Sequence, residues 1–467
     1  METKIQKDIL ITNGTIILQD KSVNADILIS SSKISKIEQN IKINTSETIL
    51  INAKNKLVIP GGIDPHVHFD LSTPLGNSSD SFETGSRAAL FGGTTSIIDF
   101  VTPMQGQSLI EALNDRKQIA KNCLIDYGFH MSITSWNNNT AKEMRQCVEN
   151  EGINSFKTYL AYQDSIGISI SQLSKVMEVA KNLGAIVNIH CEDDTMINNA
   201  RLSLLKENKT SARYHPKSRP ATAESQAVKS VIELAEKIKT KIYIVHVSAK
   251  ESIKLIENSQ KSNNFVYAET CPQYLLLDES FYNLKDYEGA KYVMSPPLRH
   301  ISHQKVLWNG ISNGIVATIA TDHCPFYFNG QKSKGFNDFT KIPNGVGGVE
   351  HRLSLIYTFG VKERLISNKK FVELCSENAA KIFGIFPQKG AINVGSDADI
   401  VVWDSEKENT ISSKTHHQNC DYDVYENFKT QGSAEYVIVN GKIAIKSGKL
   451  VNEKLQGNYI YRKNIDY

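Results

Sequence analysis

The chain has 467 residues, of which 40% are hydrophobic and 22% charged, and its 53 basic residues stand against 50 acidic ones. This length and composition can bury a large core, which excludes global disorder and a single small domain. The net charge of +3 gives no electrostatic reason to expect nucleic acid or an acidic membrane as a partner. No stretch approaches the roughly 20 apolar residues that a membrane-spanning helix needs.

The seven cysteines are scattered along the chain, and no two of them are spaced as CxxC. This pattern argues against a disulfide framework and favours a reducing compartment. We therefore expect a cytoplasmic protein.

Both ends of the chain carry short strand patterns. Asn13-Gly14 lies between two runs of β-forming residues, which predicts a hairpin, and Asn440-Gly441 predicts another. Residues 399–403 form a further strand candidate. Because each end alone has too few strands to be stable, we expect residues 1–56 and 391–467 to combine into one β-sandwich, with a C-terminal tail.

Between the two ends, residues 57–390, strand and helix patterns alternate. Helical stretches such as 171–183 and 224–239 separate the strand candidates. A first strand candidate ends at His66-Val67-His68, and seven more follow: residues 95–100, 124–131, 154–160, 186–190, 242–246, 265–270 and 315–321. Eight strand–helix units predict an α/β fold of the (β/α)8 TIM-barrel type.

Five residues of metal-ligand type stand at the ends of these predicted strands. His66 and His68 are two positions apart on one strand, so their side chains point to the same face. His190, His246 and Asp322 end the fifth, sixth and eighth strands. Each alone has an ordinary structural explanation, such as a hydrogen-bonded core histidine or a helix N-cap. Because strand ends meet at one face of a barrel, together they predict a metal site.

Lys157, in the fourth predicted strand, adds a question of charge. Four neutral histidines and one carboxylate supply too little negative charge to hold two divalent cations close together. An ammonium would repel such ions, whereas a carbamate on the same nitrogen would bridge them as an anion. Burial lowers the pKa of a lysine and favours that modification. We hypothesise that Lys157 is N6-carboxylated; the alternative is a lysine paired with an acidic neighbour.

Several motifs resemble the dihydropyrimidinase and D-hydantoinase family of cyclic amidases, within the amidohydrolase superfamily. The matching segments extend over nearly the whole chain: residues 60–68, 92–95, 156–162, 245–248, 269–274, 295–299, 321–326, 342–345 and 414–418. The last of these, Lys-Thr-His-His-Gln, favours this family over more distant cyclic amidohydrolases.

The resemblance implies a binuclear metal centre, usually of zinc. It assigns one ion to His66, His68 and Asp322 and the other to His190 and His246. Carboxylated Lys157 bridges the two ions.

The resemblance also implies how a substrate is held and cleaved. Asp322 shuttles a proton, and Tyr162 stabilises the oxyanion. The backbone groups of Ser295 and Asn344 bind the imide edge of the ring. A homotetramer is implied as well.

The implied reaction is hydrolysis of the ring amide of 5,6-dihydropyrimidines or 5-substituted hydantoins to N-carbamoyl amino acids. Related activities remain as alternatives: an allantoinase, a phenylhydantoinase or an imidase. A non-catalytic scaffold homologue is a further one, although such scaffolds have lost metal ligands. Residues 191–194, Cys-Glu-Asp-Asp, depart from the family pattern. No arginine follows His68, which argues against dihydroorotate because its carboxylate needs one.

Overall fold

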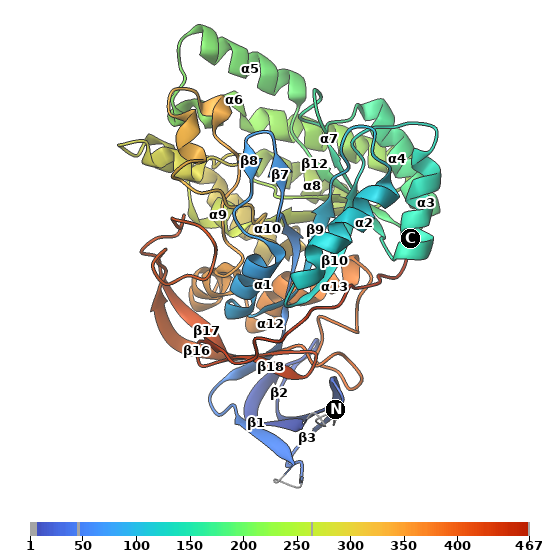
Figure 1. Ribbon diagram of the computed structural model, residues 1–467, viewed down its shortest axis with the longest axis vertical. Helices are drawn as coiled ribbons and strands as arrows, with labels where there is room; N and C mark the ends of the chain where they lie inside the picture. Colours follow the sequence, from blue (N-terminus) through green and yellow to red (C-terminus); the bar gives the residue numbers. More distant parts are fainter. Residues whose placement is uncertain (1–6, 44–46, 263–264, 466–467) are drawn as a thin grey trace.

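The structure, a computed structural model, describes residues 7–43, 47–262 and 265–465. The predicted N-terminal part, 1–56, therefore includes two stretches, 1–6 and 44–46, that lie outside the described residues, as do 466–467 at the other end. Figure 1 shows helices packed around a barrel, with a second sheet beneath it that both ends of the chain build.

The barrel sheet contains eight strands in the order β15-β14-β13-β12-β11-β10-β9-β6. These strands are β6 (Gly62–Val67), β9 (Thr94–Val101), β10 (Asp126–Ser132), β11 (Ser155–Tyr159), β12 (Ile186–His190), β13 (Ile242–Ile244), β14 (Val266–Thr270) and β15 (Thr318–Ile319). All neighbours are parallel. Val67 forms a parallel bridge with His323, and this bridge closes the ring. The predicted (β/α)8 barrel is confirmed.

Helices alternate with these strands, as the sequence predicted. They are α1 (Phe82–Phe91), α2 (Leu109–Ile119), α3 (Thr140–Glu151), α4 (Ile170–Asn182), α5 (Asp194–Lys206), α6 (His215–Ser218), α7 (Ala221–Ile238), α8 (Lys250–Ser262), α9 (Pro272–Leu276), α10 (Ser302–Ser312), α11 (Arg352–Ile356), α12 (Asn368–Val372) and α13 (Asn378–Ile382). The predicted helices 171–183 and 224–239 correspond to α4 and α7.

The second sheet joins both chain ends in one nine-stranded, mostly antiparallel layer. Its strands are β1 (Asp8–Ile17), β2 (Ser22–Ser30), β3 (Lys33–Glu38), β4 (Thr48–Asn52), β5 (Leu57–Pro60), β16 (Ile400–Thr410), β17 (Lys429–Val439), β18 (Lys442–Lys446) and β19 (Lys449–Leu450). The predicted hairpin at Asn440-Gly441 is confirmed, because Val439 pairs with Lys442 across it. A separate pair of short strands, β7 (Ser72–Thr73) and β8 (Gly76–Asn77), lies outside both sheets.

The predicted hairpin at Asn13-Gly14 is wrong. β1 runs through this dipeptide as one strand, and residues on both sides of it pair with β2. The register shifts between Ile11 and Gly14, and Asn13 has a φ of 62°. The left-handed conformation that Asn-Gly favours here forms a β-bulge, which uses the same backbone geometry as a tight turn.

The apolar run that precedes His66 divides between the two sheets. β5 pairs with β16 and β1 in the second sheet, which both chain ends build and which we call the end sheet, whereas β6 pairs with β9 in the barrel. Gly61 lies at the division, and a Cβ there would stand 2.0 Å from Thr95 Oγ1. Only glycine lets the chain pass so close to the barrel at this point.

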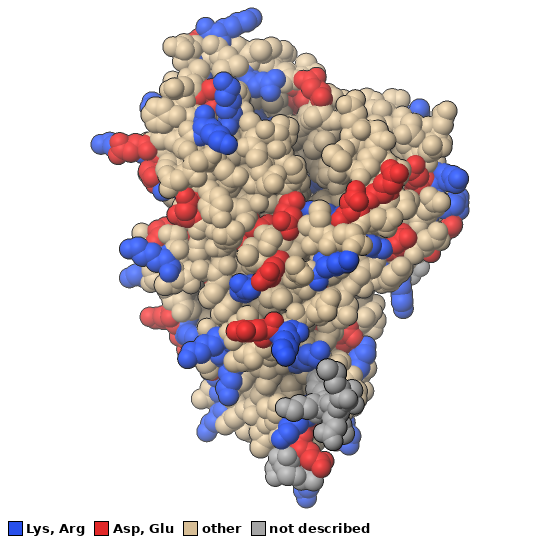
Figure 2. Space-filling model, viewed as in Figure 1, with Lys and Arg blue, Asp and Glu red and all other residues tan. Residues whose placement is uncertain are grey.

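Surface charges of both signs are interspersed on the face shown in Figure 2. Within the ranges that the structure describes, no helix has both the length and the apolar character needed to cross a membrane.

A buried ion cluster joins the barrel to the end sheet. Lys389 is 2% exposed, and its Nζ lies 2.6 Å from Asp126, on β10, and 2.6 Å from Asp399, next to β16. Asp397 lies 3.2 Å away. Burial lowers the pKa of Lys389, but the three carboxylates outweigh it and hold this pKa above its ordinary value. Lys389 therefore neutralises carboxylates that come from both parts of the fold.

Replacing Lys389 should weaken the contact between the barrel and the end sheet. Lys389→Met should lower the free energy of unfolding by about 3–5 kcal/mol, since it leaves buried carboxylates without their counter-charge. Urea unfolding measures this loss. The control is Lys33→Met, which removes a 49% exposed partner of the same Asp397 and should cost less than about 1 kcal/mol. Equal losses of unfolding free energy for the two variants would contradict the inference that this cluster holds the barrel and the end sheet together.

Candidate active site

The six predicted ligand residues lie at one end of the barrel, the carboxyl end of its strands. His66, Lys157 and His190 lie on β6, β11 and β12. His246 and Asp322 lie two and three residues beyond the last residues of β13 and β15, Ile244 and Ile319, and not on the strands themselves. His68 directly follows β6.

One half of the site forms around the carboxylate of Asp322. Its Oδ1 lies 3.1 Å from His66 Nε2 and 3.1 Å from His68 Nε2. The ligand atoms of His66, His246 and Asp322 all lie within 4.8 Å of one another. His66 Nε2 is buried and faces the Asp322 carboxylate, so this nitrogen is placed to ligate an ion at the centre of the group. This arrangement fits a bound cation.

The other half contains two histidines that face each other. His190 Nδ1 and His246 Nε2 are 3.0 Å apart. Burial lowers the pKa of both imidazoles, so both are neutral near pH 7. Neutral imidazole nitrogens this close together are donors that zinc and similar ions accept.

Lys157 is buried between the two halves, with 1% of its surface exposed. Its Nζ lies over the rings of Phe100 and Tyr159, 5.1 and 5.2 Å from their centroids. Burial lowers the pKa of Lys157 to about 8, although Asp322 and Glu269 oppose this shift. A lower pKa leaves more of the lysine uncharged near neutral pH, and only the uncharged amine reacts with CO2.

Glu269 organises both halves, and the sequence analysis did not single it out. Its Oε1 lies 2.7 Å from His66 Nδ1 and accepts a hydrogen bond from the His246 backbone N–H at 3.0 Å. Its Oε2 accepts the Tyr243 hydroxyl at 2.8 Å. Because the carboxylate holds the proton of His66 on Nδ1, Nε2 is left free to face the site. The available signal was an acidic residue inside the otherwise apolar strand 265–270.

Glu192 links the metal-type residues to the predicted substrate side. It lies 2.9 Å from His190 Nε2 and forms a buried ion pair with Arg219. Burial raises the pKa of Glu192, but Arg219 and His190 outweigh it and lower this pKa to about 2. The Arg219 guanidinium lies 5.1 Å from the centroid of the Tyr162 ring. Sequence reasoning noted Glu192 only as a departure from the family pattern.

The three predicted substrate-binding residues are neighbours. Ser295 Oγ donates to Asn344 Oδ1 at 3.1 Å, and Tyr162 lies near Ser295. Tyr162 is half-buried and its ring stands 5.4 Å from that of His190. The substrate side therefore adjoins the cluster of histidines.

Backbone strain marks the same place. Tyr162, His246 and Asp322 have φ angles of 64°, 41° and 53°, in the left-handed region. A residue with a side chain adopts this conformation at a cost of about 1–3 kcal/mol, and such residues concentrate at functional sites.

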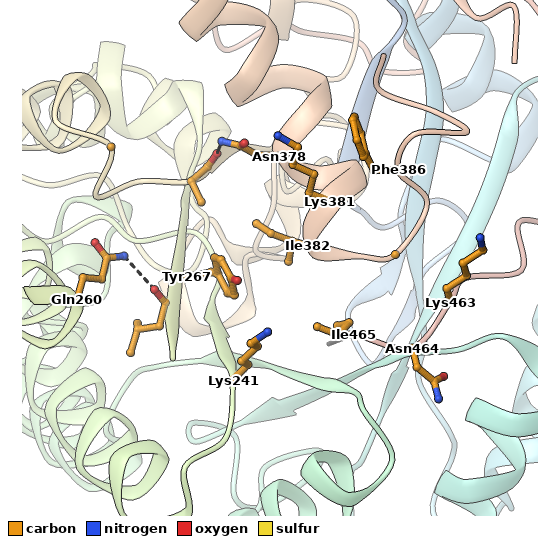
Figure 3. A pocket seen from close by; sticks show the side chains of 14 residues that line it. Lys241, Gln260, Tyr267, Asn378, Lys381, Ile382, Phe386, Lys463, Asn464 and Ile465 are labelled. Carbon is orange, nitrogen blue, oxygen red and sulfur yellow. Dashed lines mark hydrogen bonds between the residues drawn. The ribbon is translucent and has the colours of Figure 1, made fainter. Parts of the chain in front are cut away.

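A large cavity of about 730 Å³ lies at the opposite end of the barrel. Figure 3 shows Lys241, Tyr267 and Lys381 around it. Lys241 directly precedes β13 and Tyr267 lies near the start of β14, which places this cavity at the amino ends of the strands. It is distinct from the candidate active site.

Comparison with known proteins decides the family. The profile of the Amidohydrolase family matches residues 57–444. A D-hydantoinase of Geobacillus stearothermophilus is 40% identical over 97% of this chain and 96% of the relative. A dihydropyrimidinase of Dictyostelium discoideum is 38% identical over 97% of this chain and 90% of its own. The crystal structure of dihydropyrimidinase from Brevibacillus agri superposes with a TM-score of 0.97, at 39% identity, over 98% of this chain and 100% of that one.

The chain belongs to the amidohydrolase family. The predicted resemblance to its dihydropyrimidinase and D-hydantoinase group is confirmed. Membership makes this amidohydrolase a metal-dependent hydrolase, in agreement with the ligand-type residues gathered at the strand ends.

The contact between Glu269 and His66 predicts how stability of the metal-free amidohydrolase depends on pH. Burial lowers the pKa of His66, but Glu269 and Asp322 outweigh it and raise this pKa to about 9. Protonated His66 therefore stabilises the folded protein. This stabilisation is complete below pH 6.5, the pKa of histidine in the unfolded chain, and is lost as the pH rises through about 9, the pKa in the folded protein.

Glu269→Gln removes the largest raising charge, so it should destabilise the metal-free protein more at pH 6 than at pH 9.5. Urea unfolding at both pH values measures this difference. The control is Glu257→Gln, a 40% exposed glutamate on α8, whose effect should be small at both. A destabilisation by Glu269→Gln that does not change with pH would contradict this account.

Proposed function

We propose that this amidohydrolase hydrolyses the ring amide of 5,6-dihydropyrimidines or 5-substituted hydantoins and releases N-carbamoyl amino acids. The observation that carries the proposal is the convergence of His66, His246 and Asp322 near Tyr162, whose ring lies 5.4 Å from that of His190. The relatives named D-hydantoinase and dihydropyrimidinase, similar over nearly their whole length, support the same substrate class.

The alternatives are not favoured. None of the relatives described above carries the name of an allantoinase or an imidase. A scaffold that has lost its ligands fits poorly, because all six ligand-type residues are present. The partner that we propose for this enzyme is therefore a small-molecule cyclic amide.

We assign one metal ion to His66, His68 and Asp322 and a second to His190 and His246, with carboxylated Lys157 between them. Nitrogen and oxygen ligands of this kind favour zinc. When bound, such ions lower the pKa of a water molecule to about 7 and polarise the amide carbonyl.

The side chains of this amidohydrolase then handle protons and charge. Burial raises the pKa of Asp322, but its histidine neighbours outweigh it and hold this pKa well below its ordinary value. Asp322 is therefore a carboxylate at neutral pH, able to take a proton from the attacking water and return it to the departing ring nitrogen.

Tyr162 acts as a hydrogen-bond donor, whereas Asp322 accepts a proton. Burial raises the pKa of Tyr162, so its hydroxyl stays protonated and can donate to the oxyanion. The backbone groups of Ser295 and Asn344 would bind the –CO–NH–CO– edge, which presents an acceptor, a donor and an acceptor.

We further propose a homotetramer in the cytoplasm. Its domains would divide at 1–56, 57–390 and 391–467. The family resemblance supports the assembly, and the seven cysteines, all free thiols in the structure, suit a reducing compartment.

Turnover of a substrate panel tests the proposal. Metal-loaded enzyme should open dihydrouracil or hydantoin much faster than allantoin, measured by loss of ring absorbance. Asp322→Asn should lower kcat by at least about 100-fold, since positioned acid–base catalysis contributes roughly 10²–10⁴-fold. Preferential turnover of allantoin would overturn the substrate class. Turnover by the metal-retaining Asp322→Asn enzyme within tenfold of wild type would overturn the proton shuttle.

The modified lysine predicts a separate result. Lys157→Ala should lose metal and activity, because the bridging anion is gone, and short carboxylic acids should partly restore both. Metal analysis with and without added propionate measures this, and Lys175→Ala, on the exposed side of α4, is the control. Full metal occupancy in Lys157→Ala without added acid would contradict the carbamate.

A further inference from the structure

A second cluster of metal-ligand residues lies away from the active site. It consists of His351, which directly precedes α11, and of His416, Gln418 and Asp423, from the segment 411–428 that connects β16 to β17. Two of the four, His416 and Gln418, belong to the Lys-Thr-His-His-Gln motif, to which the proposed function gives no role. All four side chains are at least nine-tenths buried.

The polar atoms of this cluster converge on one point. Asp423 Oδ2 lies 2.8 Å from His351 Nε2 and 3.0 Å from His416 Nδ1. The Gln418 amide nitrogen lies 3.3, 3.2 and 3.2 Å from the same three atoms. A tetrahedral zinc shell with bonds of about 2.0–2.1 Å has its ligand atoms about 3.3 Å apart. The cluster therefore has nearly the dimensions of such a shell.

Hydrogen bonding leaves one buried atom of this cluster without a partner. Without an ion, the N–H groups of His351 Nε2 and His416 Nδ1 can both donate to Asp423 Oδ2, and the Gln418 amide donates to the same oxygen. If an imidazole nitrogen accepts from Gln418 instead, its lone pair faces the carboxylate. Gln418 Oε1 meanwhile is buried and has no partner. Rotating this amide by 180° exchanges its two ends and brings the oxygen to the point of convergence.

His416 is already held as a metal ligand would be. Its Nε2 lies 3.0 Å from the Cys420 carbonyl oxygen, an acceptor, so Nε2 carries a proton. If a bound cation displaced the Nδ1 proton, the lone pair of Nδ1 would face the point where Asp423 and Gln418 converge. Ligating histidines generally donate their other ring N–H to a carbonyl or carboxylate in this way. Asp423 is oriented similarly, because its Oδ1 accepts the Tyr425 N–H at 2.8 Å.

An ion has a path to the cluster. His351 and His416 line a cavity of about 250 Å³, together with Trp403 and Ser412. Two imidazoles, a carboxylate and an amide oxygen form a mixed nitrogen and oxygen set that suits zinc better than calcium or magnesium.

We propose that His351, His416 and Asp423, completed by the Gln418 amide oxygen, bind a structural zinc ion separate from the active-site metals. The ion would fasten the segment 411–428 to the barrel. The same segment is linked to the residue that follows Asp322, since the Asn419 N–H donates to Asp80, which in turn lies 2.9 Å from His323 Nε2. Its role is structural, because none of its four ligands touches the active-site residues.

Anomalous diffraction at the zinc edge tests this proposal directly. Crystals of the wild-type chain grown with zinc should give a peak between His351 Nε2, His416 Nδ1 and Asp423 Oδ2, apart from any peak near Asp322. The absence of a peak there would overturn the proposal and leave a proton network only. This result is independent of the proposed function, because peaks at the two places are separate.

Metal counting on variants gives a second measurement. His416→Ala and Asp423→Asn should each lose one zinc equivalent per chain relative to wild type, by plasma mass spectrometry after dialysis. The matched control, His417→Ala, changes the next residue, which is 36% exposed, pairs with Glu350 and should retain all its zinc. Unchanged zinc content in both folded cluster variants would also overturn the proposal. If they fail to fold, the wild-type crystals decide.

Discussion

Closure of the barrel is the constraint on which the rest of this structure depends. His323, four residues beyond the last barrel strand β15, forms a bridge with Val67 of the first strand β6, and the His68 N–H donates to the His323 carbonyl at 2.8 Å. This contact brings the carboxylate of Asp322 against His66 and His68. Parallel strands place their carboxyl ends on one face, so every other ligand-type residue arrives at the same place.

Burial of charge is the second constraint, and it explains much of the polar structure beneath the site. A buried carboxylate is costly unless several donors surround it. Glu269 meets this requirement with His66, the His246 backbone and Tyr243, and Glu192 meets it with His190 and Arg219. Because those donors belong to the active site, the stabilisation of each carboxylate also orients a ligand-type side chain.

Sequence patterns correctly predicted the features that depend on local backbone geometry. The alternation of strands and helices predicted the barrel, and residues at predicted strand ends gather as expected. The prediction of a hairpin at Asn13-Gly14 failed for a definable reason. A left-handed Asn serves a turn and a β-bulge equally well, and the choice between them depends on whether the flanking runs pair with each other or with a third strand, here β2.

The sequence by itself indicated the family through the resemblance of its motifs, and it predicted the barrel and the candidate ligand residues, because periodicity and strand-end position are encoded locally. Tertiary structure alone decided that β5 leaves the barrel to pair with β16, that Lys389 neutralises carboxylates from both sheets, and that Glu269 serves both halves of the site. It also brought His351 to His416 and Asp423. These are contacts between residues far apart in the chain, and no local pattern specifies which buried charge will meet which partner.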